Sequence, residues 1–276
     1  MEVLYRMTLR SKVAVLLAEF LGTAILATAA INISRSQIGI AYFVAIGVGL
    51  VMGLLVLVFG KVSGAHVNPA VTVGLWTVRK IGTLKALAYV AAQMLGGLAA
   101  WQLANFFNSG EIMSIAPKQF EWTALVAEAV GAFVFTFAIA AAIYQDLEIG
   151  KKAAVIGGGL TAGVIIASLG SSAIINPAVA LANQSWAKAY IFGPIIGGVI
   201  GFNLYVLFFA PISALIPSKK LKVSKTSKEE KPSSEAPKKT ASTAKVVSKS
   251  SSVKKAPAKK AATKSTAKKK ATTKKK

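Results

Sequence analysis

Six apolar runs constrain this chain more than any other feature of its sequence. They cover residues 13–33, 40–60, 84–107, 123–144, 153–170 and 189–212. A helix needs about 20 apolar residues to cross a bilayer, and only helices and closed barrels cross it with all backbone groups satisfied. The mean hydropathy of +0.58 and the hydrophobic share of 54% also exceed the values of ordinary soluble domains. The sequence therefore predicts an all-α, multi-pass membrane protein with six spans.

The basic residues between these runs predict how the spans are oriented. One set of loops and ends holds most of them: Arg6, Arg10, Lys12, Lys61, Arg79, Lys80, Lys151, Lys152 and a Lys-rich C-terminal segment. The other set holds Arg35, Lys118 and Lys188. Loops on the cytoplasmic side of membrane proteins carry the excess of Lys and Arg. Both termini are therefore predicted to be cytoplasmic, in a bacterial or archaeal inner membrane or a plasma membrane.

Composition divides the chain into a cytoplasmic N-terminus at 1–12, a membrane domain at 13–217 and a tail at 218–276. The tail holds 21 Lys against three Glu, so it accounts for most of the net charge of +23. It is rich in Lys, Ala, Ser, Thr and Pro and has no aromatic residue, which predicts disorder because it cannot bury a core. Its expected contacts are anionic membrane lipids or nucleic acid. A solvated tail without a dedicated partner is the alternative.

The tripeptide Asn-Pro-Ala occurs twice between the runs, as Asn68, Pro69, Ala70 and as Asn176, Pro177, Ala178. Asn is a favoured N-cap residue and Pro is favoured at the first helical position, so each copy opens a helix. The apolar stretch that follows ends near Val78 in the first copy and near Trp186 in the second. Each helix is then about 15 Å long, roughly half the hydrocarbon thickness. Two half-helices that enter from opposite faces are expected to meet at the midplane with their N-termini facing.

The facing N-termini predict a particular chemistry. Each Asn side-chain oxygen is expected to cap its own half-helix, which leaves the amide NH2 groups of Asn68 and Asn176 as donors toward a lumen. The positive ends of the two helix dipoles oppose cations and interrupt proton hopping along a file of water. Small uncharged molecules are therefore the expected permeants.

The two halves of the membrane domain repeat each other. The asparagines of the two motifs are 108 positions apart, and Glu19 in the first run lies 109 positions before Glu128 in the fourth. Three spans in each half invert the second half relative to the first. The sequence thus predicts inverted repeats at about 13–107 and 123–212, with the broken helices marking a functional site near the midplane.

Residues 63–71 read Ser-Gly-Ala-His-Val-Asn-Pro-Ala-Val, and residues 174–179 read Ile-Ile-Asn-Pro-Ala-Val. This pair of motifs on inverted half-helices resembles the signature of the aquaporin or major intrinsic protein family, over about residues 12–214. The resemblance implies the aquaporin-like fold and a homotetramer with one pore per subunit. It also implies passive flow of water or small uncharged solutes, with no catalytic residue, cofactor or metal.

The chain departs from the family pattern where the selectivity constriction is expected. The second motif of the family usually runs Asn-Pro-Ala-Arg, whereas Val179 follows the motif here. When the family's other constriction positions are transferred to this chain by their spacing from the motifs, they fall on Val48, Val164 and Ala173. These side chains predict a wide, apolar constriction that either passes larger neutral molecules or dewets and resists water. Ala180 stands where glycerol facilitators of the family usually have Asp, so a glycerol assignment has no direct support.

Four polar residues are predicted to anchor the loops: Glu19, Glu128, His66 and Gln93. Carboxylates inside spans are functional candidates by default, and a proton relay is one interpretation of the two Glu. Against it, no Lys or Arg in adjacent spans can exchange partners with them, and the matching Glu of the family holds the re-entrant loop. His66 is expected to anchor loop backbone and line the cytoplasmic vestibule, and Gln93 to bond between spans. With one His and no Cys, a His-ligated metal site and thiol chemistry are not expected.

Two other functional classes remain open. A secondary transporter also uses inverted repeats and broken helices, and it would show saturable uptake coupled to an ion gradient. A sealed membrane anchor that displays the basic tail is the other class, and its function would be lost with residues 218–276. A passive channel is the interpretation that the paired motifs favour.

Overall fold

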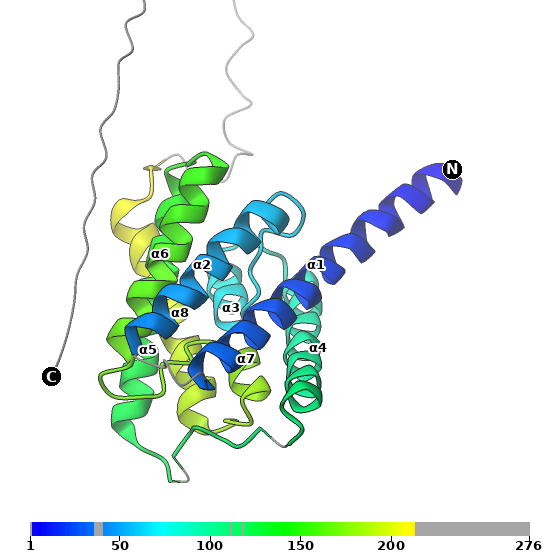
Figure 1. Ribbon diagram of the computed structural model, residues 1–276. Coiled ribbons are helices and arrows are strands. Elements are labelled where there is room, and N and C mark those ends of the chain that lie inside the picture. The colour runs from blue at the N-terminus through cyan, green and yellow to red at the C-terminus, as the bar shows by residue number, and fades with distance from the viewer. Residues whose placement is uncertain (1, 36–40, 111, 118, 213–276) are drawn as a thin grey trace, which may run out of the picture. The chain divides into compact units, whose positions relative to one another are not determined.

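The computed structural model describes residues 2–35, 41–110, 112–117 and 119–212, and the regular elements within these ranges are all helices (Figure 1). Their order is α1 (Glu2–Arg35), α2 (Ala41–Phe59), α3 (Pro69–Thr77), α4 (Thr83–Asn108), α5 (Trp122–Tyr144), α6 (Ile149–Ala167), α7 (Pro177–Ala182) and α8 (Lys188–Phe209). Six of these helices are long and apolar enough to cross a membrane, and α3 and α7 are short. The prediction of six spans and two half-helices is confirmed. The tail at 218–276 lies outside the described residues.

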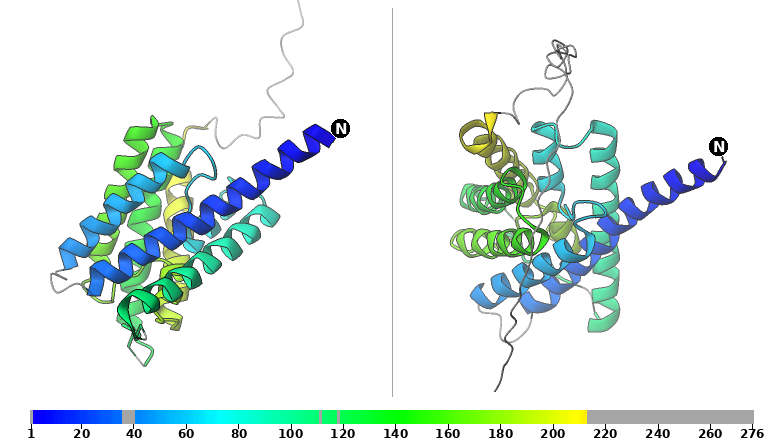
Figure 2. Two further views of the ribbon diagram at one scale, coloured as in Figure 1. Left: turned by 45° about the vertical axis from the view of Figure 1, so that its right-hand side comes forward. Right: turned by 90° about the horizontal axis from the view of Figure 1, so that it is seen from above.

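Helix α1 begins well before the first predicted span. The sequence predicts a span from residue 13, whereas α1 starts at Glu2. No Gly or Pro stands between Glu2 and Lys12, so no residue there ends the helix. The membrane-span candidate within α1 is Arg10–Arg35, and the part before it extends away from the other helices (Figure 2).

Helix α7 is shorter than the apolar stretch predicts. It ends at Ala182, so the prediction that it runs to about Trp186 is wrong. Gln184 adopts a left-handed φ of 56°, and the N–H of Ser185 donates back to the carbonyl of Ala180 over 2.8 Å. This bonding is typical of a Schellman motif, which closes the helix whatever the polarity of the residues that follow. The second half-helix is therefore only about 9 Å long.

The two half-helices interlock the two repeats. Helix α3, from the first repeat, packs against α8, the last helix of the second repeat, and α7 packs against α4, the last helix of the first. Figure 1 shows α3 and α7 among the long helices. Each repeat therefore supplies a wall against which the half-helix of the other repeat is held, so neither half encloses the centre alone.

Glycines bring the helices of the two repeats into direct backbone contact. Gly49 on α2 and Gly157 on α6 are 108 positions apart, the same offset as the two motifs. A Cβ on Gly49 would lie 2.7 Å from the carbonyl oxygen of Gly157, and a Cβ on Gly157 would lie 2.6 Å from that of Gly49. Small residues allow such close approach of membrane helices. This reciprocal contact is what a two-fold relation between the repeats requires.

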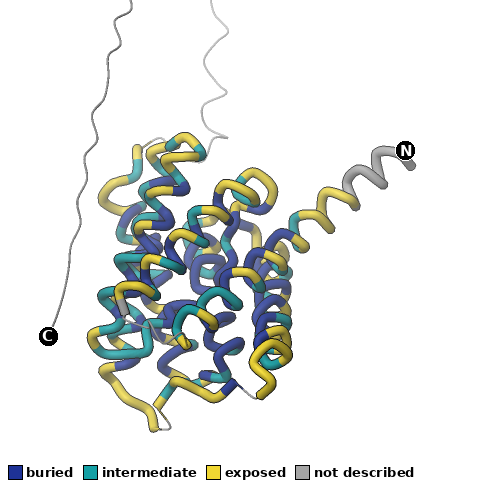
Figure 3. The backbone as a smooth tube through the Cα atoms, in the orientation of Figure 1, coloured by how far each residue is buried: buried dark blue, intermediate teal, exposed yellow. Residues whose placement is uncertain are grey.

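Several polar side chains are fully buried inside the helix bundle, and many large apolar side chains are exposed on its outer surface. Leu50 and Leu54 on α2 are 71% and 56% exposed, whereas Glu19 and Glu128 are fully buried. Figure 3 shows buried backbone through the interior of the bundle and exposed turns along its outer side. This distribution suits a protein surrounded by lipid, and it concentrates the hydrogen-bonding groups around α3 and α7.

The close contact between α2 and α6 predicts different effects for two neighbouring substitutions. Gly157→Ala places a methyl group against backbone, so it should destabilise the protein by about 1–3 kcal/mol. A Cβ on Gly158 meets nothing within 4 Å, so Gly158→Ala should leave stability unchanged or raise it slightly. Thermal unfolding in detergent compares the two variants, and equal unfolding temperatures would contradict this packing.

Candidate functional site

Each Asn of the two motifs caps the half-helix that it begins. The side-chain oxygen of Asn68 accepts from the N–H of Ala70 over 2.8 Å, and that of Asn176 accepts from the N–H of Ala178 over 3.0 Å. Both asparagines have extended backbone, and Pro occupies the first helical position after each. This is the geometry expected of an N-cap residue. It fixes the orientation of both amide groups relative to their helices.

The two asparagines also bind each other's loops. Asn68 Nδ2 donates to the carbonyl of Ile175, and Asn176 Nδ2 donates to the carbonyl of Val67, each over 3.0 Å. These reciprocal bonds hold the N-termini of α3 and α7 together at the centre of the bundle. An amide NH2 group has two hydrogens. One N–H of each asparagine is therefore used between the loops, and the second remains for a molecule that reaches it.

Glu19 organises the loop before α3. Its carboxylate accepts from the backbone N–H groups of His66 and Val67, over 3.0 and 2.8 Å. Gln93 Nε2 on α4 donates to the same carboxylate over 2.7 Å and to the hydroxyl of Thr72 over 2.9 Å. Glu19 and Gln93 are both fully buried. The carboxylate thus connects α1, α4 and the loop through charge-assisted hydrogen bonds.

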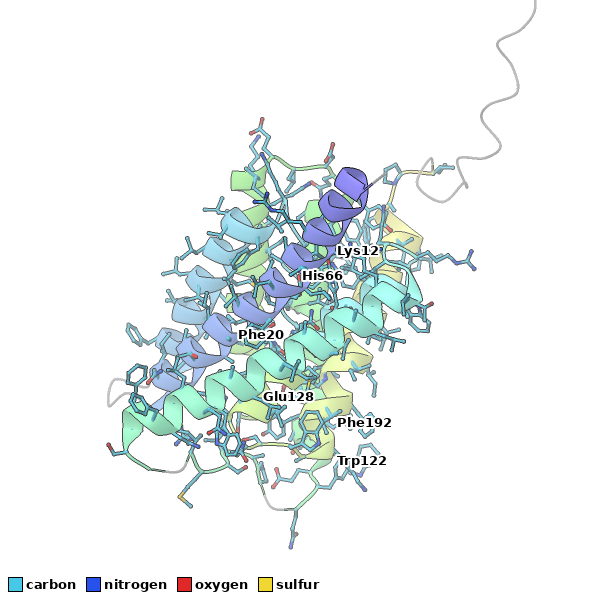
Figure 4. The ribbon with its side chains drawn as sticks, turned by 90° about the vertical axis from the view of Figure 1, so that its right-hand side faces the viewer. Lys12, Phe20, His66, Trp122, Glu128 and Phe192 are labelled. Atoms are coloured by element: carbon cyan, nitrogen blue, oxygen red, sulfur yellow. The ribbon has the colours of Figure 1, made fainter. Side chains whose placement is uncertain are left out.

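Glu128 stands in the matching place before α7. Its carboxylate accepts from the backbone N–H of Ile174 over 2.9 Å and from that of Ile175. The hydroxyl of Ser171 donates to it over 2.7 Å. Figure 4 shows Glu128 and His66 at different levels of the bundle. Each carboxylate therefore has its oxygens occupied by donors from its own loop, which suits an anchor better than a proton relay.

The loops before the two half-helices share an unusual backbone. Ala65 and Val67 have φ of 50° and 42°, and Ala173 and Ile175, each 108 positions later, have φ of 52° and 43°. A β-branched residue in the left-handed region is strained and persists only where its surroundings hold it. The hydrogen bonds to the two Glu side chains do so. Neither loop has Gly or Asn at these positions, so the sequence carries no signal for this conformation.

Two cavities meet these loops: one is lined by both motif asparagines, and the other is lined by the loop before α3 and by α3 itself. The first, here called the Val179 cavity, is lined by all four predicted constriction residues and both motif asparagines: Val48, Val164, Ala173, Val179, Asn68 and Asn176. The second, here called the His66 cavity, is lined by His66, Val71, Leu75 and the two lysines Lys61 and Lys152, with others. Met52 lines both. No charged residue of the described ranges lines the Val179 cavity, whereas lysines line the other.

Backbone carbonyls face these cavities because of how the Glu side chains hold the loops. The carbonyl of Ala65 shares a peptide unit with the N–H of His66, and a trans peptide directs the two groups oppositely. Since that N–H points to Glu19, the carbonyl points away from it, where Ala65 and His66 line the His66 cavity. The same reasoning directs the carbonyl of Ala173 away from Glu128 and toward the Val179 cavity.

Comparison with known proteins agrees with this arrangement. A family profile described as "Major intrinsic protein" matches residues 6–205. The chain belongs to the major intrinsic protein family. The protein named Aquaporin Z of Photorhabdus laumondii is 30% identical over 227 residues, which are 71% of this chain and 97% of that protein. The protein named Aquaporin AqpM of Methanothermobacter marburgensis is 32% identical over 193 residues, 60% of this chain and 77% of that one.

A solved structure shows the same fold. The aquaglyceroporin from Plasmodium falciparum superposes with a TM-score of 0.62 at 22% sequence identity. The match covers 74% of this chain and all of that one. The major intrinsic protein fold thus accounts for the described helices.

Sequence reasoning missed several residues of this major intrinsic protein site. Thr72 bonds His66 Nδ1 over 3.2 Å and also bonds Gln93, and Ser171 bonds Glu128. Asn183 lines the Val179 cavity. Helical spacing provides a signal for both, because Thr72 lies four residues after Asn68 and Asn183 lies four residues after Val179, one helical turn in each case. Thr72 and Asn183 are therefore on the same helix face as these two residues.

The bonds to Glu128 predict a strong effect of removing its carboxylate. Glu128→Leu leaves the N–H groups of Ile174 and Ile175 buried without their acceptor, at about 1–3 kcal/mol each. The variant should therefore yield little folded protein in detergent and little osmotic water flow in liposomes. Glu121→Leu makes the same change at an exposed residue just before α5 and should behave like wild type. Normal yield and flow of Glu128→Leu would show that the loop does not depend on this anchor.

Proposed function

We propose that this chain is a passive channel through which water and small uncharged solutes cross the membrane. The proposed path runs from the Val179 cavity, past Asn68 and Asn176, to the His66 cavity. The observation that carries it is that two capped half-helices meet N-terminus to N-terminus, and that the asparagines where they meet line a cavity. Membership of the major intrinsic protein family supports a channel and not an enzyme.

The paired helix ends provide the selectivity against charge. The N-termini of α3 and α7 each carry the positive end of a helix dipole. The remaining N–H of each asparagine can donate to an oxygen that passes, which orients water or a hydroxyl at this point. A cation meets positive potential from both sides, while a neutral oxygen gains hydrogen bonds. Exclusion of protons and cations is therefore assigned to this pair.

The constriction is assigned to Val48, Val164, Ala173 and Val179, which line one cavity together. None of them carries a charge or a side-chain donor, so the ring offers little to replace the hydration of a solute. The carbonyl of Ala173 supplies one acceptor. We propose a wide apolar constriction that passes neutral solutes larger than water.

The setting of the channel is also a proposal. The His66 cavity, with Lys61 and Lys152, is assigned to the cytoplasmic side, since cytoplasmic loops are enriched in basic residues. This places both termini in the cytoplasm and the chain in an inner or plasma membrane.

A homotetramer is proposed because the family resemblance implies it. The tail at 218–276 is proposed to bind anionic lipid or nucleic acid through its lysines.

Stopped-flow light scattering on proteoliposomes tests the proposed function. Osmotic water flow is compared with entry of glycerol and urea, beside empty liposomes. Flow well above the empty liposomes with a low activation energy supports a continuous pore. Rates that match empty liposomes for every solute would contradict it.

Deleting residues 218–276 separates the channel from the alternative of a sealed anchor with a functional tail. The deletion should leave permeability largely intact if the membrane domain conducts. Loss of all function with an intact, folded membrane domain would favour the anchor. Saturable uptake that depends on an ion gradient would instead favour a secondary transporter.

The assigned constriction predicts the effect of a charged side chain at Val179. Val179→Arg should narrow the pore and add donors, so glycerol and urea entry should fall severalfold relative to water flow. Val179→Leu adds bulk without a donor and serves as the matched control for size. An unchanged ratio of solute to water permeability in Val179→Arg would place the constriction elsewhere.

A further inference from the structure

Asn183 carries a buried hydrogen-bond acceptor that has no partner in the described part of the chain. It follows the last residue of α7, is 2% exposed and lines the Val179 cavity. Its Nδ2 donates to the carbonyl of Val179 over 3.2 Å, but its Oδ1 has no hydrogen-bond partner among the described residues. Buried polar atoms are nearly always paired in folded proteins. An unpaired, buried oxygen on a residue that lines a cavity therefore points to a ligand.

The internal repeat shows that packing alone does not require an amide at this position. Val71 and Val179 are 108 positions apart and each lines one cavity. Leu75 and Asn183 are also 108 positions apart, and Leu75 lines the His66 cavity on the wall that corresponds to Asn183. The valine is kept in both repeats, while leucine in one becomes asparagine in the other. Asn183 thus adds a polar group to one cavity only.

We propose that Asn183 is a solute-selecting residue, whose Oδ1 accepts a hydrogen bond from the O–H or N–H of a neutral solute in the Val179 cavity. This inference rests on the proposed path through that cavity. The solutes that it favours are small polyols and urea-like amides, which carry both donors and acceptors. As a solute moves along the cavity, its oxygens accept from Asn68 and Asn176 at the N-terminal end of α7, and its hydrogens are then donated to Asn183, which lies one helical turn beyond Val179 at the other end.

The acceptor matters because most of the side chains that line this cavity are apolar. A solute that enters the cavity loses part of its water shell, and a polar group without a replacement partner pays for that loss. Asn183 supplies such a partner on the side of the cavity where the family usually has an Arg and this chain has Val179. Removing one ordinary hydrogen bond should slow the passage of these solutes about fivefold relative to water.

An isosteric pair of variants tests the role of the oxygen. Asn183→Val removes both polar atoms, whereas Asn183→Thr keeps a hydroxyl that donates to the Val179 carbonyl and still accepts. Stopped-flow measurements on proteoliposomes give the glycerol-to-water and urea-to-water permeability ratios for each. We expect both ratios to fall about fivefold in Asn183→Val and to stay near wild type in Asn183→Thr. A ratio does not depend on how many channels fold, so a merely structural role would not change it.

Asn203→Val provides the matched control. Asn203 on α8 also donates to the carbonyl four residues before it, that of Val199, but it is exposed and lines neither cavity. Its ratios should equal those of wild type. Unchanged ratios in Asn183→Val, or an equal fall in Asn203→Val or Asn183→Thr, would overturn the inference. If wild type itself conducts no faster than empty liposomes, the proposed path fails, which is a different outcome from failure of Asn183.

Discussion

Backbone N–H groups of non-helical segments that are buried in a membrane protein need acceptors from the protein itself. Residues 64–68 and 172–176 are non-helical segments, Val67 and Ile175 within them are fully buried, and an unsatisfied N–H without access to water costs several kcal/mol. Glu19 and Glu128 each accept two of these N–H groups, from the loop of their own repeat. The rest of the centre depends on these bonds, because they hold the loops in left-handed conformations that the residues would not otherwise adopt.

Once the loops are fixed, the other features of the centre follow. Their carbonyls turn away from the carboxylates toward the two cavities, and the motif asparagines reach the carbonyls of the opposite loop. The N-termini of α3 and α7 then face each other with one donor free on each Asn. The proposed selectivity against charge and the proposed path for neutral molecules thus depend on the same hydrogen bonds that stabilise the loops.

The sequence predicts the helices well because their signals are local. Apolar runs set the six spans, and Asn-Pro sets the starts of α3 and α7. The end of α7 could not be predicted, because the turn at Gln184 is chosen by backbone bonds and not by polarity. The strained φ of Val67 and Ile175 and the unpaired oxygen of Asn183 also escaped prediction, since they depend on contacts between distant segments.

The proposed pore passes Val179, and the absence of cysteine from the chain allows a direct test of this position. Val179→Cys is reconstituted into liposomes, labelled with a membrane-impermeant methanethiosulfonate, and assayed for osmotic water flow before and after labelling. Labelling should block the flow of this variant and leave wild type unaffected. Complete labelling of the cysteine with undiminished flow would show that water does not pass Val179.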